Sequence, residues 1–137
     1  TYLRHKRQGR NGGAALRDWL DRYVDTGGIS ESGLEQVALD AFLDAGVPPT
    51  AQLWVHVDSE TSYRIDLAFP DRMIAVEIDG SQHEEKPAKA ADKRRDARLE
   101  ALGWTVVHVK AATFATDLAR ALRVVLTASV VSQSGVA

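Results

Sequence analysis

The sequence predicts one α/β domain built around a mixed β-sheet, with its core elements in the order α-β-β-β-α-β. Three successive runs of β-forming residues lie between two segments with helical periodicity, and a fourth run follows the second segment. The second and third runs flank a Pro-Asp pair typical of a tight turn, which predicts an antiparallel hairpin. The helical segment after the third run can return the chain for a parallel strand, so we expect a mixed sheet.

The length of the chain suits a single domain. A chain of 137 residues can bury one sizeable core. We expect a flexible basic lead-in at residues 1–13, one domain with extra helices at both ends at residues 14–129, and a frayed tail at residues 130–137.

The expected helices are marked by apolar residues at helical spacing and by end signals. Their ranges are Ala14–Val24, Ser32–Ala45, Pro87–Leu102 and Thr113–Ser129. Ser32 and Glu35 have the spacing of a capping box at the start of the second helix. Gly46 ends that helix, and Gly103 is expected as the C-cap of the third.

The expected strands are Gln52–Val57, Ser62–Phe69, Arg72–Asp79 and Trp104–Val109. A two-residue turn sets Phe69 opposite Arg72. The same register places Arg64 opposite Glu77, with Asp66 as a diagonal neighbour of Glu77. Alternation then gives one polar face with small residues, formed by Arg64, Asp66, Ala68, Ala75, Glu77 and Asp79. The other face is expected to be core and consists of Ile65, Leu67, Phe69, Ile74, Val76 and Ile78.

Composition excludes several classes of protein. The 45% hydrophobic and 26% charged content is that of an ordinary globular protein. The absence of cysteine excludes disulfides and Cys-ligated metal sites. No apolar run approaches the ~18 residues of a membrane span, and no signal peptide is visible, so a cytoplasmic location is expected by default. The three tryptophans, Trp19, Trp54 and Trp104, are expected in the core, although an exposed one near a site could stack on a base.

Charge is unevenly distributed. The net charge of −2 and the pI near 6.0 argue against a surface built entirely for nucleic acid. Two basic clusters are nevertheless compatible with binding a phosphate backbone: Arg4, Lys6, Arg7 and Arg10, and then Lys86, Lys89, Lys93, Arg94, Arg95 and Arg98. The charge pattern by itself favours ordinary solvated helix faces.

The polar face of the hairpin could hold a metal ion. Asp66 and Glu77, with Cβ atoms about 7 Å apart as diagonal neighbours, could share a divalent cation. Oxygen ligands without thiols favour Mg²⁺ or Mn²⁺, which can activate a bound water. The structural alternative is an Arg64–Glu77 ion pair, a capping role for Glu35 and an ordinary loop histidine at His83.

Three fragments together resemble a known family: "RIDLAFP", "VEIDGSQH" and "DKRRDARLEALGWTVVHV". They resemble the very-short-patch-repair-like endonuclease family of the PD-(D/E)xK restriction-endonuclease-like superfamily, and within it a bacterial branch with an E-x-D-G-x-x-H strand end. The resemblance extends from about Leu34 to Val109. It implies the restriction-endonuclease-like α-β-β-β-α-β core.

The resemblance also implies roles for the acidic residues. Asp66 and Glu77 would bind Mg²⁺, with the carbonyl of Ile78 as a third ligand. Asp79 stands where the superfamily motif has a lysine, which is a departure from the pattern. Glu35 matches the glutamate of the preceding helix, and Glu35 and Asp79 would orient the ligands or hold a second metal.

The remaining implied roles concern the base and the DNA contacts. His83, beyond the strand end, would act as general base or hold the attacking water. Phosphate contacts are expected from the basic helix, at Lys89, Lys93, Arg94 and Arg95. Orienting roles around the ligands are expected for Arg64, Asp92 and Asp96. The cysteine-ligated zinc site of very-short-patch-repair enzymes is missing here.

The sequence therefore predicts a Mg²⁺- or Mn²⁺-dependent endonuclease acting on DNA, in repair or defence. One alternative is a catalytically inactive nuclease fold that binds nucleic acid, since the motif lysine is missing. The other is a protein-interaction module of a toxin–antitoxin or defence system, which the low net charge favours. Because the sequence begins at Thr1, one expectation is a further N-terminal domain that supplies specificity. A homodimer is a second option.

Overall fold

The computed structural model describes residues 30–80 and 86–130 of the chain. Along them the elements follow in the order α3 (Glu31–Asp44), β1 (Thr50–His56), β2 (Ser62–Phe69), β3 (Ile74–Asp79), α4 (Lys86–Ala101), β4 (Thr105–Lys110), the short 3-10 helix η1 (Ala111–Thr113) and α5 (Phe114–Thr127). This confirms the predicted α-β-β-β-α-β order and the helix after it. The expected lead-in, the helix at residues 14–24 and residues 131–137 of the tail lie outside the described residues.

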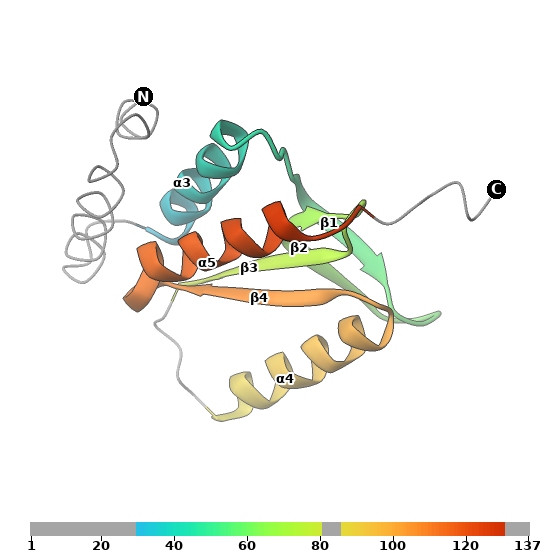
Figure 1. The fold of residues 1–137 in the computed structure, drawn as a ribbon. Helices are drawn as coiled ribbons and strands as arrows, with labels where there is room; N and C mark the ends of the chain where they lie inside the picture. The colour runs from blue at the N-terminus through green and yellow to red at the C-terminus, as the bar shows by residue number, and fades with distance from the viewer. Residues whose placement is uncertain (1–29, 81–85, 131–137) are drawn as a thin grey trace.

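The four strands form one mixed sheet in the order β1-β2-β3-β4. The β1–β2 and β2–β3 pairs are antiparallel, and the β3–β4 pair is parallel. Helix α4 makes the crossover between the two parallel strands. Figure 1 shows α3 and α5 above the sheet and α4 below it, so the domain has three layers. The predicted α/β class with a mixed sheet is confirmed.

The hairpin between β2 and β3 differs from the prediction in its turn. Phe69 pairs with Ile74, not with Arg72, so the expected two-residue turn is wrong and the turn has four residues. The Arg72 N–H donates to the Phe69 carbonyl at 2.9 Å, and Met73 then takes a positive φ of 55°. The Pro-Asp pair forms a first tight turn, and two further residues bring the chain back into register.

This two-residue shift changes which residues face one another across the hairpin. Ala68 pairs with Ala75 as alternation required. The same register continued along the strands sets Asp66 directly across from Glu77, where Cβ atoms are ~4.5–5.5 Å apart in ordinary sheets. The expected pairing of Arg64 with Glu77 is therefore wrong, and the two carboxylates are closer neighbours than predicted.

Both faces of the sheet are covered by helices. The larger core lies between the sheet and the α3–α5 layer, where the rings of Phe42 and Phe69 meet edge to face at 4.8 Å. A smaller core lies under α4 and consists of Ile65, Ala68, Ala75, Leu99 and Trp104. Ala68 and Ala75, at the turn end of the predicted polar face, are thus part of this core. The end with Asp66 and Glu77 stays polar.

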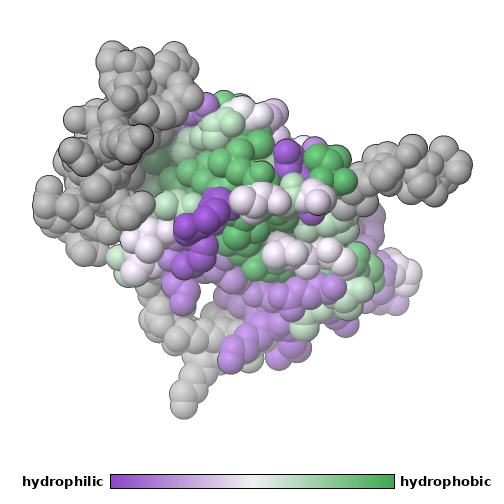
Figure 2. Space-filling view, viewed as in Figure 1, coloured by the Kyte–Doolittle hydropathy of each residue, from purple (hydrophilic) through white to green (hydrophobic). Residues whose placement is uncertain are grey.

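Ile65 belongs to the smaller core, although strand alternation predicted the opposite face. The register of β1 and β2 is interrupted beside Ile65, because Gln52 and Asp66 are not paired in it and Gln52 has a positive φ of 57°. Figure 2 shows mostly hydrophilic residues along α4 and apolar residues gathered over α3 and α5. None of the described helices is long and apolar enough to cross a membrane.

Candidate functional site

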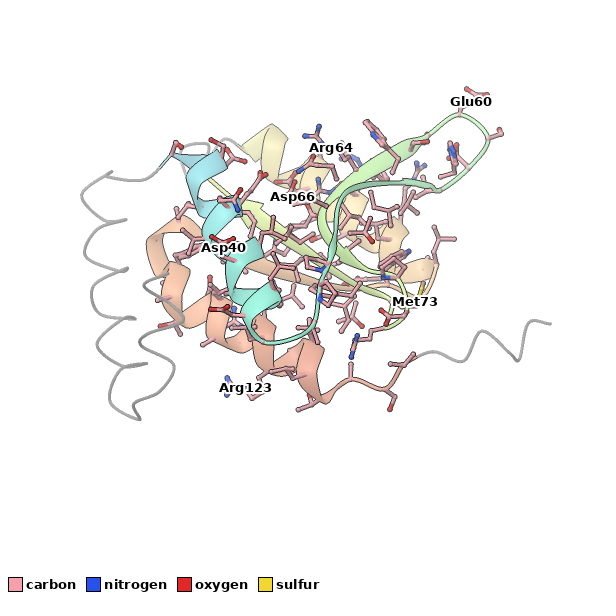
Figure 3. The ribbon with its side chains drawn as sticks, turned by 90° about the horizontal axis from the view of Figure 1, so that it is seen from above. Asp40, Glu60, Arg64, Asp66, Met73 and Arg123 are labelled. Carbon is pink, nitrogen blue, oxygen red and sulfur yellow. The ribbon has the colours of Figure 1, made fainter. Side chains whose placement is uncertain are left out.

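A groove of about 500 Å³ lies where β1, β2 and β3 meet the helices α3 and α4. Most of the site residues predicted from the sequence line it: Arg64, Asp66, Glu77, Ile78, Asp79, Asp92 and Arg95. Glu31 and Trp54 line it as well, and the sequence had not assigned them to the site. Figure 3 shows Arg64 and Asp66 as neighbours on β2, with Asp66 toward α3.

Two acidic side chains lie at the centre of this groove. Asp66 accepts a hydrogen bond from the Ile78 N–H at 2.9 Å, which links β2 to β3 beyond the last paired residues. Glu77 is only 3% exposed. Its Oε1 accepts from the Arg95 guanidinium at 3.1 Å, whereas its buried Oε2 has no hydrogen-bond partner among the described residues.

Burial sets the protonation behaviour of these carboxyl groups. Burial raises the pKa of Glu77 to about 7, against the positive charge of Arg95, and the negative charge of Asp66 adds to the rise. Burial also raises the pKa of Asp66, opposed first by the hydrogen bond from Ile78. Ionising both of these neighbouring acids is unfavourable, and a bound cation would reduce that cost.

A cation here would depend on few protein ligands. No group of three or more His, Asp or Glu side chains in residues 30–80 and 86–130 is placed to hold a metal ion. Asp66, the free Oε2 of Glu77 and the carbonyl of Ile78 are all hard oxygen donors, and water completes the coordination of Mg²⁺ at most protein sites. The donor set therefore fits a hard divalent cation.

A histidine that the sequence analysis missed lies beside the acidic pair. His108 on β4 pairs with Glu77 across the parallel strands. Its Nδ1 lies 3.1 Å from Asp79 and its Nε2 2.6 Å from Asp96. The hydrogen bond to Asp79, and then the one to Asp96, raise the pKa of His108 to about 9 against the effect of burial. The imidazolium thus joins β3 to α4.

Helix α4 presents one face to the groove and the other to solvent. Asp92, Arg95 and Asp96 share a face at i, i+3 and i+4 spacing, as the sequence predicted. Lys93 and Arg94 are exposed on the other side. The side chain of Lys89 and the whole of His83 lie outside the described residues, so their expected roles stay predictions.

Glu35 is not part of a capping box. Ser30, not Ser32, is the N-cap of α3, and its hydroxyl accepts from the Gly33 N–H at 3.1 Å. Glu35 instead accepts a hydrogen bond from Gln52 at 3.4 Å. Burial, followed by the charge of Asp66, raises the pKa of Glu35. The alternative interpretation, in which Glu35 only caps the helix, is therefore wrong. The carboxylate of Glu35 lies close enough to Asp66 for their charges to interact.

The mixed sheet, its crossover helix and the acidic pair on adjacent strands define a restriction-endonuclease-like domain. The chain belongs to the restriction-endonuclease-like family REase_MTES_1575, whose model matches residues 40–128, more than half of the chain. The match covers Asp66 and Glu77 but not Glu35. It does not distinguish the very-short-patch-repair-like branch, which stays a prediction.

Several curated proteins are similar to this chain. The uncharacterized proteins MT2308 and Rv2248, from two strains of Mycobacterium tuberculosis, are each 35% identical over 106 residues, covering 76% of this chain and 38% of each relative. The uncharacterized protein YcjD of Escherichia coli (strain K12) is 45% identical over 47 residues, 34% of this chain and 38% of that protein. The chain thus spans little more than a third of these relatives. No solved structure matches it significantly.

Proposed function

We propose that this domain is a divalent-metal-dependent endonuclease that hydrolyses phosphodiester bonds in DNA. The observation that carries the proposal is the buried Glu77, whose Oε2 has no hydrogen-bond partner among the described residues and which faces a groove beside Asp66. A buried carboxylate oxygen without a partner is costly, so its persistence argues for a ligand that completes it. Membership of a restriction-endonuclease-like family supports a nuclease fold.

Asp66, Glu77 and the Ile78 carbonyl would hold Mg²⁺ or Mn²⁺ in this proposal. The metal would supply a water of lowered pKa and charge stabilisation at the phosphate. The hydrogen bond from the Ile78 N–H fixes the Asp66 carboxylate in place. Arg95 pairs with Glu77 at 3.1 Å while the second oxygen is unpaired, so the guanidinium lowers the pKa of the acid against the effect of its burial.

The remaining chemical roles follow from the strand end. Asp79, in the place of the motif lysine, is paired with His108 and would act by holding the end of β3 against α4. His83 is proposed as the general base, because it follows β3 by only a few residues. Glu35, beside Asp66, would orient the ligands or a second metal.

DNA would approach over α4 and the groove. The exposed Lys93 and Arg94, together with Lys89, offer positive charge for phosphates that pass over the solvent side of α4. Preference for a particular base sequence would come from a further domain or from a second copy in this proposal, since the chain spans 38% of its mycobacterial relatives. A role in repair or defence, and the very-short-patch-repair-like branch, belong to this proposal.

A second candidate is a nuclease fold that binds nucleic acid without cleaving it. The ion pair from Arg95 to Glu77, together with an Asp at position 79 in place of the motif lysine, favours this candidate. It predicts salt-dependent DNA binding that does not depend on a divalent cation. A protein-interaction module, which the net charge of −2 favours, predicts no DNA binding at all.

Plasmid nicking separates the nuclease from the other two candidates, and salt-dependent DNA binding then separates those two from each other. Supercoiled plasmid is incubated with the domain in Mg²⁺, Mn²⁺ or EDTA, beside Asp66→Asn, Glu77→Gln and the control Glu60→Gln. Glu60 is exposed at the tip of the β1–β2 hairpin, away from Asp66 (Figure 3). We expect metal-dependent relaxation that falls roughly 100-fold or more in the two site variants and is unchanged in the control. Folded protein that cleaves in neither metal would refute the nuclease.

A further inference from the structure

Trp54 is exposed where an indole would ordinarily be buried. Its exposed fraction is 61%, against 8% for Trp104 in the smaller core. It packs with neither apolar core, so the expectation that it is a core residue is wrong. Yet it lines the same groove as Asp66 and Glu77. A large apolar ring presented at the edge of a polar groove is a typical contact surface for a ligand.

The sheet register places this ring close to the acidic pair. Trp54 pairs with Arg64 across β1 and β2, and all three of Trp54, Arg64 and Asp66 line the groove. Asp66 is two residues from Arg64 on the same strand, so it is a diagonal neighbour of Trp54 at roughly 7–8 Å. The base of a nucleotide lies one sugar away from its phosphate, a distance of the same order.

Trp54 and Arg64 form what we call the rim of the groove, and their chemistry fits a nucleotide. An indole face stacks on any base, and the guanidinium of Arg64 beside it can contact a phosphate or stack in turn. A base inside a duplex already has both faces stacked on its neighbours. A ring that stands on a β-strand therefore stacks most readily on a base that is unpaired or turned out of the helix, because no neighbouring bases have to be unstacked.

We propose that Trp54 is a stacking platform for an unpaired base next to a phosphate held in the groove, so that the domain binds DNA with single-stranded or locally unpaired segments. The inference rests on the proposed function in one respect, namely that the groove holds the phosphate backbone. Arg64 then keeps the neighbouring phosphate in place, and the acidic pair of Asp66 and Glu77 lies one nucleotide away.

Binding without cleavage tests the stacking. In EDTA, labelled oligonucleotides that are single-stranded, fully paired, or paired with an internal unpaired segment are titrated with wild type, Trp54→Ala, Trp54→Phe and the control Leu126→Ala. Leu126 is an exposed apolar residue on α5 that does not line the groove. We expect wild type to bind the unpaired forms at least ~10-fold more tightly than the duplex. Trp54→Ala should lose that difference, while Trp54→Phe and Leu126→Ala should keep most of it.

A second readout reports the ring directly. Tryptophan fluorescence should be quenched when wild type binds single-stranded DNA, and Trp54→Phe should bind with much less quenching because its residue 54 no longer fluoresces. Equal binding of paired and unpaired DNA, or unchanged binding by Trp54→Ala, would overturn the proposal. Failure of every form of DNA to bind the folded wild type would overturn it as well, and would favour a protein partner for the rim.

The two proposals fail separately. Asp66→Asn should keep the preference for unpaired DNA and the quenching while losing cleavage. If wild type never cleaves but Trp54 still governs binding, the stacking platform stands and the nuclease does not. If wild type relaxes plasmid and Trp54→Ala cleaves paired and unpaired substrates as wild type does, the nuclease stands and the stacking platform does not.

Discussion

Two carboxylates are buried among the described residues of this protein, and their surroundings differ sharply. Asp117 on α5 is 6% exposed and accepts three hydrogen bonds, from the Lys110 N–H, the Thr113 hydroxyl and the Arg120 guanidinium, at 2.8–3.1 Å. Glu77 on β3 is 3% exposed, and one of its oxygens is paired while the other has no partner.

The difference separates an acid whose hydrogen bonds are filled within the fold from the acid that we propose as part of the site. Asp117 joins the end of β4 to α5, and its three partners come from the last residue of β4, from η1 and from α5 itself. A buried carboxylate with its acceptors filled lowers the free energy of the fold. Glu77 stabilises the folded state less, because a buried oxygen without a hydrogen-bond partner is unfavourable until a ligand binds to it. Incomplete satisfaction is therefore the stronger sign of a site than burial alone.

Removing Asp117 should produce the largest loss of stability. Asp117→Ala leaves one main-chain donor, one hydroxyl and one guanidinium without their acceptor, so we expect about 3–4 kcal/mol of destabilisation. Urea unfolding followed by circular dichroism measures it. Asp117→Asn, which keeps one acceptor oxygen, should lose less. A loss below about 1 kcal/mol in the alanine variant would break the comparison, since Asp117 would then be no more structural than Glu77.

Glu77 should make stability depend on pH in the opposite sense from an acid whose pKa is lowered on folding. Its pKa is raised from 4.5 to about 7 in the folded protein, so the folded state holds a proton that the unfolded state has lost between those values. Stability should therefore fall as pH rises from about 4.5 to 7, by up to roughly 3 kcal/mol. Residue 77 cannot titrate in Glu77→Gln, so the fall should be much smaller there, with only the part due to Asp66 and Glu35 remaining.

Unfolding midpoints measured at a series of pH values check this prediction. The same series with added Mg²⁺ tests whether a cation binds to the ionised acids. A cation bound by ionised Glu77 and Asp66 stabilises the folded state most above pH 7, so the fall should shrink with Mg²⁺ in wild type alone. A wild-type profile that is flat from pH 4.5 to 7 would mean that Glu77 ionises freely, and the comparison with Asp117 would lose its basis.

His108 should have an intermediate effect. Its pKa is raised from 6.5 to about 9, so its contribution to stability is fully present below pH 6.5 and is lost as pH rises through 9. His108→Asn releases Asp79 and Asp96 from their shared partner and should cost about 1–2 kcal/mol at pH 6. At pH 10 the variant and wild type should have nearly the same unfolding midpoint. An equal cost at both values would assign His108 a packing role instead.

The sequence predicted the fold because its signals are local. Helical and strand periodicities, the order of the elements and the polar face of the hairpin all follow from neighbouring residues. The turn length was missed because the Pro-Asp pair starts a tight turn but does not say where pairing resumes. That depends on Met73 taking a positive φ, which its residue type does not favour.

The site was predicted in part for the same reason. Asp66 and Glu77 interrupt apolar strands, and that pattern is visible along the chain. The role of His108 depends on the parallel register of β3 and β4, which the local sequence does not specify. The alternation of "VVHV" could have placed this residue on the same face as Glu77. Trp54 was expected in the core because its exposure depends on where the helices leave the sheet uncovered.

An exposed ion pair should have the smallest effect and sets the baseline for the two buried acids. Asp58 and Arg98 lie 3.4 Å apart with side chains that are 46% and 50% exposed. Water screens the attraction in such a pair, and both side chains lose rotamer freedom when they pair. Asp58→Asn should therefore leave the unfolding midpoint almost unchanged. The measurement is repeated at low and high salt, where wild type and variant should shift together. A clear loss at low salt alone would show that surface charge supports the β1–β2 hairpin. The stability effects assigned to Glu77 and Asp117 would then have to be measured above that electrostatic background.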